Sequence, residues 1–302
     1  MAINRSAIAK ELLPGLNAIF GTEYGEVADE HLPLFEMENS DRAFEEEVLF
    51  TGFGSAPTKS EGAAVQYDDA QESYTSRYTN ETVALAFSIT EEAMEDNLYD
   101  TFAKVRAKAL ARAMGNTKQV KAADVFNNAF NASFAGGDGV SLINTAHPTI
   151  GDGSQSNDIG NVDLSESAIE TAVINISKIE DDRGILIGAS ARSLHVPSDL
   201  MFTADQILNS PGTTGSDNND INAVRHMGVM PEGFYVNRRF TDTNAFFVKT
   251  DCPNGTKMFT RVPLQTKMEP DFDTGNMRFK ARERYSFGFS DWRQWFGSNG
   301  TS

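Results

Sequence analysis

The sequence contains a single cysteine, Cys252, so no disulfide bond can form within the chain. It contains no run of about 18 apolar residues, and this excludes a membrane-spanning helix of the usual kind. The N-terminal segment has neither an apolar core nor a small-residue cleavage site, so no secretory signal is predicted. These absences favour a protein of a reducing compartment with no membrane partner.

Basic residues are scarce. The 26 lysines and arginines face 43 acidic residues, which gives a net charge of −17. A chain this acidic does not present a general nucleic-acid-binding face, although it can lie near DNA without holding it tightly. Acidity that only maintains solubility is an equally good explanation. The chain has 302 residues, 40% of them hydrophobic, which is enough for one large or two medium domains with a real core.

Recognisable catalytic and metal-binding motifs are also absent from the sequence. None of the four histidines has a His or Cys partner at metal-ligand spacing; they are His31, His147, His195 and His226. There is no Walker-type phosphate loop, no complete dinucleotide fingerprint and no nucleophile elbow. The stretch from Asp217 to Asp220 lacks the spacing and the glutamate of a calcium loop. We therefore predict no catalytic, cofactor-binding or metal-binding residues and no cofactor.

The first part of the chain is predicted to be an arm rather than part of a core. Residues 6–20 show helical spacing of apolar residues after a cap at Ser6, and Pro14 should bend or shorten this helix. The spaced residues are Ile8, Leu12, Leu16 and Ile19. Residues 21–47 are acidic and have little periodicity, and their last part, residues 41–47, is predicted to be solvated.

Residues 48–82 are interpreted as a long two-stranded excursion with too few apolar residues for a core of its own. Its first strand is predicted at residues 48–50. The returning strand carries Tyr74, Ser76 and Tyr78 on one side. A loop of this length inside a compact domain usually has a function or is disordered.

A strand and a long helix follow. Residues 83–89 alternate apolar and small side chains, which predicts a strand. A helix of about 40 residues should begin near Thr90 and end at the turn starting at Gly136, with Gly115 as a site that could kink or split it. Its predicted apolar stripe is Met94, Leu98, Phe102, Val105, Ala109, Val120, Ala123 and Phe126.

The remaining residues predict a mixed α/β section and a long final strand. Helices are expected at residues 163–182, capped by Asp163 with Glu166, and at 199–208. Strands are expected at residues 185–187, 193–197, 233–240 and 245–250. The acidic pairs Glu91-Glu92 and Asp181-Asp182 are interpreted as helix-end charges rather than acid–base pairs.

The final strand, from residue 277 to 289, has two unlike faces. One face carries Met277, Phe279, Ala281, Tyr285, Phe287 and Phe289, and the other carries Arg278, Lys280, Arg282 and Arg284. This basic row needs partners in so acidic a chain. Nucleic acid, plain solvent and the acidic residues of a neighbouring subunit are three explanations. We favour the third, with residues 21–47 as one source of the acids.

The stretch from Gly136 to Thr149 adds a more specific signal. It contains Asp138-Gly139, the apolar pair Leu142-Ile143, and Thr145-Ala146-His147-Pro148. This stretch, together with the order of elements, resembles the major capsid proteins of tailed bacteriophages, and the Mu-like major head subunits most of all. The resemblance implies an α+β chain with the HK97-like capsid fold, in which His147 is a structural residue in a fixed bend.

The resemblance also implies a division of the chain into functional segments. These are an N-terminal arm at residues 1–47, an extended β-hairpin loop at 48–82, a peripheral domain with a spine helix at 83–160, an axial α/β domain at 161–258, and a return to the peripheral domain at 259–302. Some members of the family crosslink a loop lysine to an asparagine. Lys59 lies in the matching region, but one lysine does not predict a crosslink.

The implied function is a structural, non-enzymatic subunit of the virion, assembled in the host cytoplasm into hexamers and pentamers that enclose DNA. Portal, scaffolding and decoration proteins are the further partners implied, with DNA nearby but not bound by sequence. A separate scaffolding protein, or earlier cleavage, is expected because the chain starts directly with the arm. Three alternatives remain: an encapsulin-like compartment shell, an enzyme with an unrecognised site around His147, and a tail or baseplate component.

Overall fold

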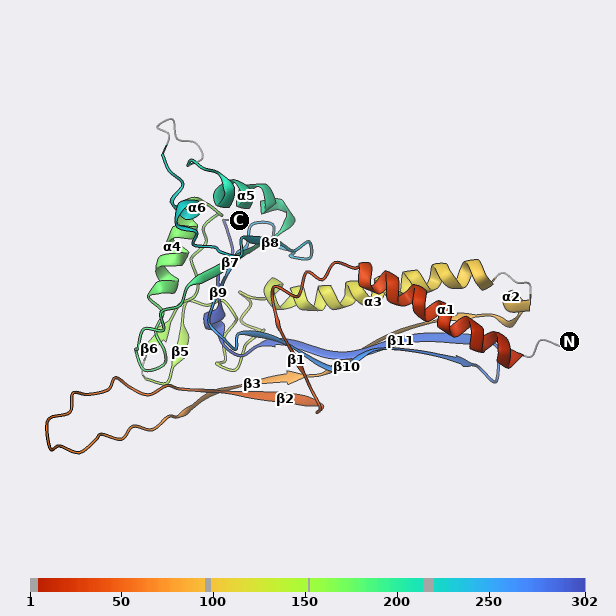
Figure 1. Ribbon diagram of the computed structural model, residues 1–302, viewed down its shortest axis with the longest axis horizontal. Coiled ribbons are helices and arrows are strands. Elements are labelled where there is room, and N and C mark those ends of the chain that lie inside the picture. The colour runs from red at the N-terminus through yellow and green to blue at the C-terminus, as the bar shows by residue number, and fades with distance from the viewer. Residues whose placement is uncertain (1–4, 96–98, 152, 214–219, 302) are drawn as a thin grey trace.

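The computed structural model describes residues 5–95, 99–151, 153–213 and 220–301. It has an elongated part made of helices on a sheet, a smaller α/β part at one end, and a hairpin that projects away from both (Figure 1). The fold is therefore mixed α+β, as the sequence predicted. None of the helices in the described ranges is both long and apolar enough to cross a bilayer.

The elongated part is built on a four-stranded sheet in the order β1-β10-β11-β4. Its strands are β1 (Glu36–Asn39), β10 (Thr256–Pro270), β11 (Met277–Phe289) and β4 (Glu81–Ile89). β10 and β11 form a long antiparallel hairpin, and β4 pairs antiparallel with β11 from Met277↔Ile89 to Tyr285↔Glu81. The alternation predicted for β11 is present, since Met277, Phe279 and Ala281 are buried while Arg278, Lys280 and Arg282 are exposed.

Two helices lie along one side of this sheet, α1 (Arg5–Glu26) and α3 (Tyr99–Asn127), with the five-residue α2 (Glu91–Glu95) before α3. α3 has 29 residues and runs through Gly115, so the predicted split does not occur. It ends at Asn127, nine residues before the predicted stop at Gly136, because the chain turns at residues 128–130. The long helix was expected to begin near Thr90. A helix does begin at Glu91, but residues 96–98, between α2 and α3, lie outside the described residues.

The buried face of α3 differs from the predicted stripe. Val105 is 61% exposed, and Ala109 is exposed as well. Val120 is 39% exposed, whereas Ala123 and Phe126 of the predicted stripe are buried. The other buried residues were not predicted; they are Ala103, Ala107, Leu110, Ala111, Met114 and Ala122. Ala103, Ala107, Leu110 and Met114 share a core with Leu16 and Phe20 of α1. Small alanines let the two helices approach closely, so packing against α1 decides the face. The side chains of Met94, Leu98 and Phe102 lie outside the described residues.

The close approach of Val27 explains why a glycine, Gly115, stands in the middle of α3. A Cβ atom built on Gly115 would lie 2.9 Å from a methyl group of Val27, at the end of α1. We expect Gly115→Ala to destabilise the protein by about 1 kcal/mol, because the overpacking cost exceeds the gain in helix propensity. Chemical denaturation should show this, and the double variant Gly115→Ala/Val27→Ala should recover most of the loss. Stabilisation by Gly115→Ala alone would contradict the packing argument.

The first 47 residues are more firmly attached to the rest of the subunit than the sequence predicted. α1 continues through Pro14 to Glu26, rather than being shortened there. Leu34 and Phe35 are buried in a core with Phe126 and Trp295, and β1 is part of the main sheet. The prediction of an arm without core contacts is therefore wrong for residues 16–39, because a few large apolar side chains anchor an otherwise polar segment. The side chains of Ser6, Ile8 and Leu12 lie outside the described residues.

The predicted two-stranded excursion exists, but it begins earlier. β2 (Phe44–Phe50) pairs antiparallel with β3 (Glu72–Thr79), so residues 44–47 form a strand rather than a solvated segment. Phe44 lies under the guanidinium of Arg77, which favours the extended conformation there. On β3, Ser76 and Tyr78 are buried and Tyr74 is half-buried, on the side predicted for them.

A second four-stranded sheet, in the order β12-β9-β7-β8, forms the smaller part. Its strands are β12 (Trp295–Ser298), β9 (Phe246–Thr250), β7 (Ala191–Val196) and β8 (Phe234–Val236). The helices beside it are α4 (Glu166–Ser177), α5 (Met201–Asn209) and α6 (Ala223–Met227), and a short pair, β5 (His147–Thr149) and β6 (Gly153–Gln155), lies near its lower end (Figure 1). Residues 259–302 therefore contribute to both sheets. Two single 3-10 turns, Ser198–Leu200 and Trp292–Gln294, complete the elements.

Two sequence predictions in this part are wrong. The cap of α4 is Ser165, whose Oγ accepts the Ala168 N–H at 3.2 Å, whereas Asp163 instead accepts hydrogen bonds from Thr301. Residues 185–187 do not form a buried strand, and Leu186 and Ile187 are exposed. The 15-residue strand β10 was not predicted, because its second half mixes polar and apolar residues without a clear run.

Candidate assembly surfaces

The bend around His147 is held by a buried polar network. The His147 ring is fully buried, with Nδ1 2.6 Å from Asp138 Oδ2 and Nε2 3.0 Å from Asn157 Oδ1. Asn157 Nδ2 in turn donates to the Leu142 and Trp295 carbonyls at 2.7 and 2.8 Å. The ring also stacks on Trp292, with centroids 4.1 Å apart. These contacts join the bend to the C-terminal segment and leave no open approach for a substrate.

We expect His147→Ala to act on stability. The variant leaves the buried Asp138 and Asn157 without their ring partner, and each unpaired polar group costs about 1–3 kcal/mol. Urea unfolding at neutral pH should show a loss in that range or above. The control is His226→Ala, on the exposed part of α6, which should change the free energy of unfolding by less than about 0.5 kcal/mol. An unchanged stability for His147→Ala would contradict the structural role.

The other candidate chemical groups are also structural. Burial is the main cause that lowers the pKa of His195 to about 3, and this ring shares a hydrogen bond with Ser193. Burial also lowers the pKa of His31, which contacts Gln119, and raises the pKa of the buried Cys252 thiol. Within the described ranges, no group of three His, Cys, Asp or Glu side chains converges as a metal site would require. Asp217 lies outside the described residues.

Asp182 belongs to a buried ionic cluster rather than to a helix end. Arg293 donates to Asp182 Oδ1 at 2.6 Å and to the Glu180 carbonyl at 3.2 Å, and its Nη1 lies 3.4 Å from Asp291 Oδ1. Burial raises the pKa of Asp291, although Arg293 opposes the effect. The sequence gave no sign that these residues meet, because 111 positions separate Asp182 from Arg293.

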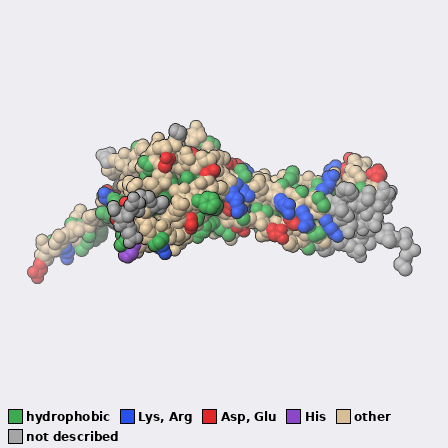
Figure 2. Space-filling model, turned by 90° about the horizontal axis from the view of Figure 1, so that it is seen from above, with side chains coloured by type: hydrophobic (Ala, Val, Ile, Leu, Met, Phe, Trp, Pro, Cys, Tyr) green, Lys and Arg blue, Asp and Glu red, His purple; other side chains and the backbone are tan. Residues whose placement is uncertain are grey.

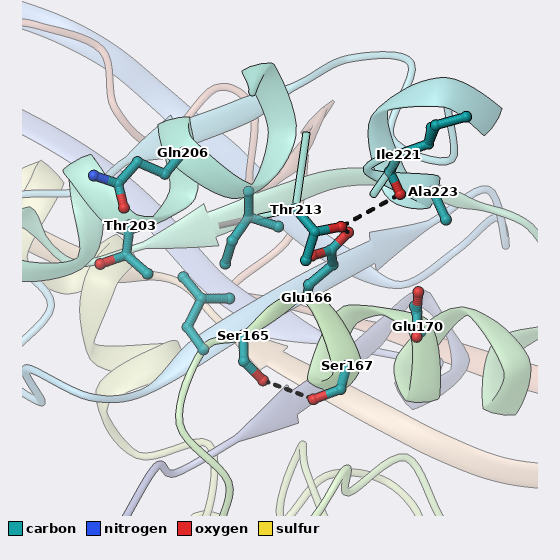
Figure 3. Close-up of a pocket in the computed structure, with 11 residues that line it drawn as sticks. Ser165, Glu166, Ser167, Glu170, Thr203, Gln206, Thr213, Ile221 and Ala223 are labelled. Atoms are coloured by element: carbon teal, nitrogen blue, oxygen red, sulfur yellow. Dashed lines mark hydrogen bonds between the residues drawn. The ribbon is translucent and has the colours of Figure 1, made fainter. Parts of the chain in front are cut away.

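A shallow cleft lies between α4 and α5 in the smaller part, with a volume of about 560 Å³. Figure 3 shows the residues that line it, with Ser165 and Glu170 from the α4 region and Gln206 from α5. The Ser165 hydroxyl is turned toward that of Ser167, 3.1 Å away. Thr213 is 3.5 Å from Glu166 Oε1 and 3.3 Å from the Ile221 carbonyl, so it already has partners. The lining has neither an aligned nucleophile and base nor a set of converging charges, so it supports no reaction.

The acids of residues 21–47, which we favoured as partners for the basic row, are largely used within the subunit. Glu23 pairs with Lys108 and Arg112 of α3, and Glu30 with Arg238 and Arg239. Glu38 and Glu47 both reach Lys257, at 2.9 and 2.5 Å. These acids therefore attach the segment to its own subunit.

The basic row itself is only partly paired. Arg278 pairs with Asp271 at 2.6 Å, but Lys280 and Arg282 have no ion pair with any acid in the described ranges. The structure also reveals a second basic surface, on α3, where lysines and arginines gather over the elongated part (Figure 2). There, Glu23, Glu81 and Glu283 neutralise Lys108, Arg112, Lys121 and Lys118. Lys280 and Arg282 thus differ from these four side chains of the α3 surface, each of which has an ion pair within its own subunit.

The loop of the β2–β3 hairpin is a long exposed segment. Almost every residue from 52 to 72 is exposed, including Phe53 at 62%, Val65 at 64% and Tyr67 at 94%. The base of the loop is held by Arg183, which donates to Asp68 at 3.1 Å and to the Asp69 carbonyl at 2.6 Å. Large apolar side chains held in solvent are typical of an interaction surface.

Taken together, the described residues show an exposed, projecting hairpin and no assembled catalytic group. Comparison with known families agrees. The family model described as phage capsid protein matches residues 72–296, about three quarters of the sequence, and the chain therefore belongs to the phage capsid protein family. Its role is that of a structural capsid component of the virion. No curated protein is significantly similar to the sequence.

Solved structures show the same fold at low sequence identity. The capsid of a native GTA particle computed with C5 symmetry is similar, with 14% identity, a TM-score of 0.57 and 91% coverage of each chain. The Mycobacterium phage Adephagia structure has 11% identity, a TM-score of 0.55 and 90% coverage of each chain. A virus-like particle from Pyrococcus furiosus has 9% identity, a TM-score of 0.53, and coverage of 95% of this chain and 99% of that one. These likenesses establish the HK97-like capsid fold.

Proposed function

We propose that this capsid protein is the repeating subunit of an icosahedral phage head and assembles into hexamers and pentamers around the DNA genome. The observation that carries the proposal is the hairpin of residues 44–79. It has no core of its own at its tip, yet it exposes Phe53, Val65 and Tyr67. A subunit that keeps such a segment extended gains from burying it against neighbours in a closed symmetric assembly.

The segments have the roles that the resemblance implied. Residues 48–82 reach a neighbouring subunit, and residues 161–258 form the axial domain whose tips meet at the capsomer centre. The spine helix and the long β10–β11 hairpin form the peripheral domain, at residues 83–160 and 259–302, although β12 within the second range completes the sheet of the axial part. The match of Asp138-Gly139 through His147-Pro148 to the Mu-like head subunits supports that subgroup. Portal, scaffolding and decoration proteins are the further partners in this proposal.

Expression of the chain alone, followed by negative-stain electron microscopy and analytical sedimentation, tests the proposal. We expect closed shells, or rings of five or six subunits. A compact monomer that persists across protein and salt concentrations would count against it. Tubes or stacked rings would indicate the tail or baseplate alternative.

A compartment shell of the encapsulin type is the second candidate, because the virus-like particle from Pyrococcus furiosus has the same fold over almost its whole length. The two candidates differ in what the particles contain. Particles purified from the native source should contain DNA and a portal protein if the chain forms a phage head. A co-purifying enzyme in place of DNA would favour the compartment.

A further inference from the structure

The contact between α1 and α3 repeats itself once per helical turn on both helices. On α1, the side chains that pack inward are four positions apart; they are Leu16, Phe20 and Tyr24. On α3, three alanines of the same core have the same spacing; they are Ala103, Ala107 and Ala111. The two helices run in the same direction (Figure 1). A step of α1 by four residues, about 6 Å along α3, would therefore place its large side chains on equivalent alanines.

The aromatic contact of α1 with the sheet would also survive such a step. The ring of Phe20 lies 6.2 Å from the ring of Phe279 on β11, and 6.1 Å from the ring of Tyr24, one turn later on α1. A step towards the start of α3 would bring Tyr24 to the place of Phe20, and Phe20 to the place of Leu16. An aromatic ring would still lie beside Phe279, so the core would keep side chains of similar kind and size.

The ion pairs between the two helices have the same four-residue repeat and give the step a direction. Glu23 of α1 binds both Lys108 and Arg112, and Lys104 stands one turn before them on α3. A step towards the start of α3 would give Glu23 the cations Lys104 and Lys108, so it would again have two. A step the other way would leave it with Arg112 and the uncharged Asn116. Only the first direction keeps the charges matched.

The contacts near the end of α1 do not repeat. The Tyr24 hydroxyl donates to Glu283 at 3.2 Å and accepts a hydrogen bond from Lys118 at 2.8 Å. Val27 packs on Gly115, where a Cβ atom would come within 2.9 Å of it. After a step, Glu283 would still have Lys118 at 3.0 Å, so no buried carboxylate would lose its cation. The step therefore costs local hydrogen bonds and packing, but not an unpaired buried charge.

A third contact without a repeat joins α1 to the sheet, since Thr266 of β10 donates to Asn17 at 2.8 Å. We propose that α1 has a second position on α3, one turn closer to the start of α3, and that Asn17, Tyr24 and Val27 hold it in the position observed. One-turn displacements of one packed element past another are an established form of conformational change. In the proposed shell, the step would extend the outer end of α1 towards a neighbour. That consequence rests on the proposed function, whereas the step itself does not.

Distances between spin labels test the proposal on the unassembled full-length chain. Labels at Ala18→Cys and Asp124→Cys report on α1 and α3, because both positions are exposed while the native cysteine is buried. Otherwise unchanged protein should show one main distance, with the second state below about 10%. The triple variant Asn17→Ala/Tyr24→Phe/Val27→Ala should show a clearly resolved second distance, about 6 Å longer than the first. A single distance in the triple variant would overturn the proposal.

Two further substitutions in the triple variant identify the cause of the longer distance. Lys104→Gln removes the cation that Glu23 would reach, so the longer distance should be lost, whereas Arg106→Gln, at an exposed position nearby, should leave it unchanged. Persistence after Lys104→Gln, or equal loss with Arg106→Gln, would overturn the proposal. Tyr24→Phe alone should give a smaller share of the longer distance, and a single distance there would decide against the proposal if the triple variant does not fold. Absence of shells would contradict the proposed function alone.

Discussion

Replacement of Arg293 with methionine should remove about 3–5 kcal/mol from the free energy of unfolding, the largest stability effect that we expect from a single substitution. The guanidinium is 5% exposed and lies between Asp182 and Asp291, whose side chains are 4% and 13% exposed. Its removal leaves two buried carboxylates without a cation, and breaking a buried ion pair on one side costs about this much. Guanidinium chloride should be avoided for the measurement, and urea denaturation monitored by tryptophan fluorescence is suitable.

The same variant should show a distinctive pH dependence. Burial already raises the pKa of Asp291 in the folded protein, and loss of Arg293 raises this pKa further. A carboxyl group with a raised folded pKa holds its proton more tightly when folded, so its contribution to stability grows as pH falls through that pKa. The deficit relative to wild type should therefore be smaller at pH 5 than at pH 7. The matched control is Arg225→Met, at an exposed position of α6, which should cost less than about 0.5 kcal/mol at both pH values.

Removal of the hairpin tip should abolish assembly while leaving the subunit folded. Residues 52–70 can be replaced with Asn-Gly, because the Thr51 N–H already donates to the Gln71 carbonyl at 2.9 Å and closes the ladder there. The deletion removes mainly the exposed ion pair between Asp68 and Arg183, which contributes about 1 kcal/mol at most to the free energy of unfolding. Thermal unfolding should therefore stay close to that of wild type, while sedimentation should show no shells or rings.

A single substitution in the same loop provides the comparison for this deletion. Lys59→Ala should assemble normally, because Lys59 is exposed and its side chain forms no ion pair with another described residue. Assembly by the deletion variant would mean that the hairpin is not a contact between subunits. Loss of assembly by Lys59→Ala would instead point to the crosslink that the sequence did not predict.

Local patterns predicted the elements whose stability depends on neighbours in sequence. The alternation in β4 and β11 and the helix of residues 199–208 are present because one side of each segment is consistently apolar. The structural interpretation of His147 came from the family resemblance, and it agrees with the buried, hydrogen-bonded ring. The buried partners that hold it, Asn157 and Trp292, were not predicted, since nothing local connects them to the histidine.

The features that could not be predicted from the sequence depend on contacts between segments that are far apart along the chain. The acids of residues 21–47 looked free in sequence, but Lys108, Arg112 and Lys257 lie beside them in the folded subunit. The face that α3 buries depends on α1, which is about 90 residues earlier and packs on alanines rather than on the larger Val105. The free edge of β4 is a property of sheet order, and no sequence period distinguishes an edge strand from a central one.

The position of β12 at the end of the chain determines when the second sheet can finish folding during synthesis on the ribosome. Strands β7, β8 and β9 are translated well before residues 295–298, and the second sheet is complete only when those residues have emerged. The same holds for the hydrophobic cores that contain Trp292 and Trp295. A nascent chain therefore exposes its β2–β3 hairpin before the body that carries it is complete. Slow translation of the last residues would leave the exposed apolar side chains of this hairpin near other nascent chains for longer. Rapid completion lets the subunit fold before it meets its partners.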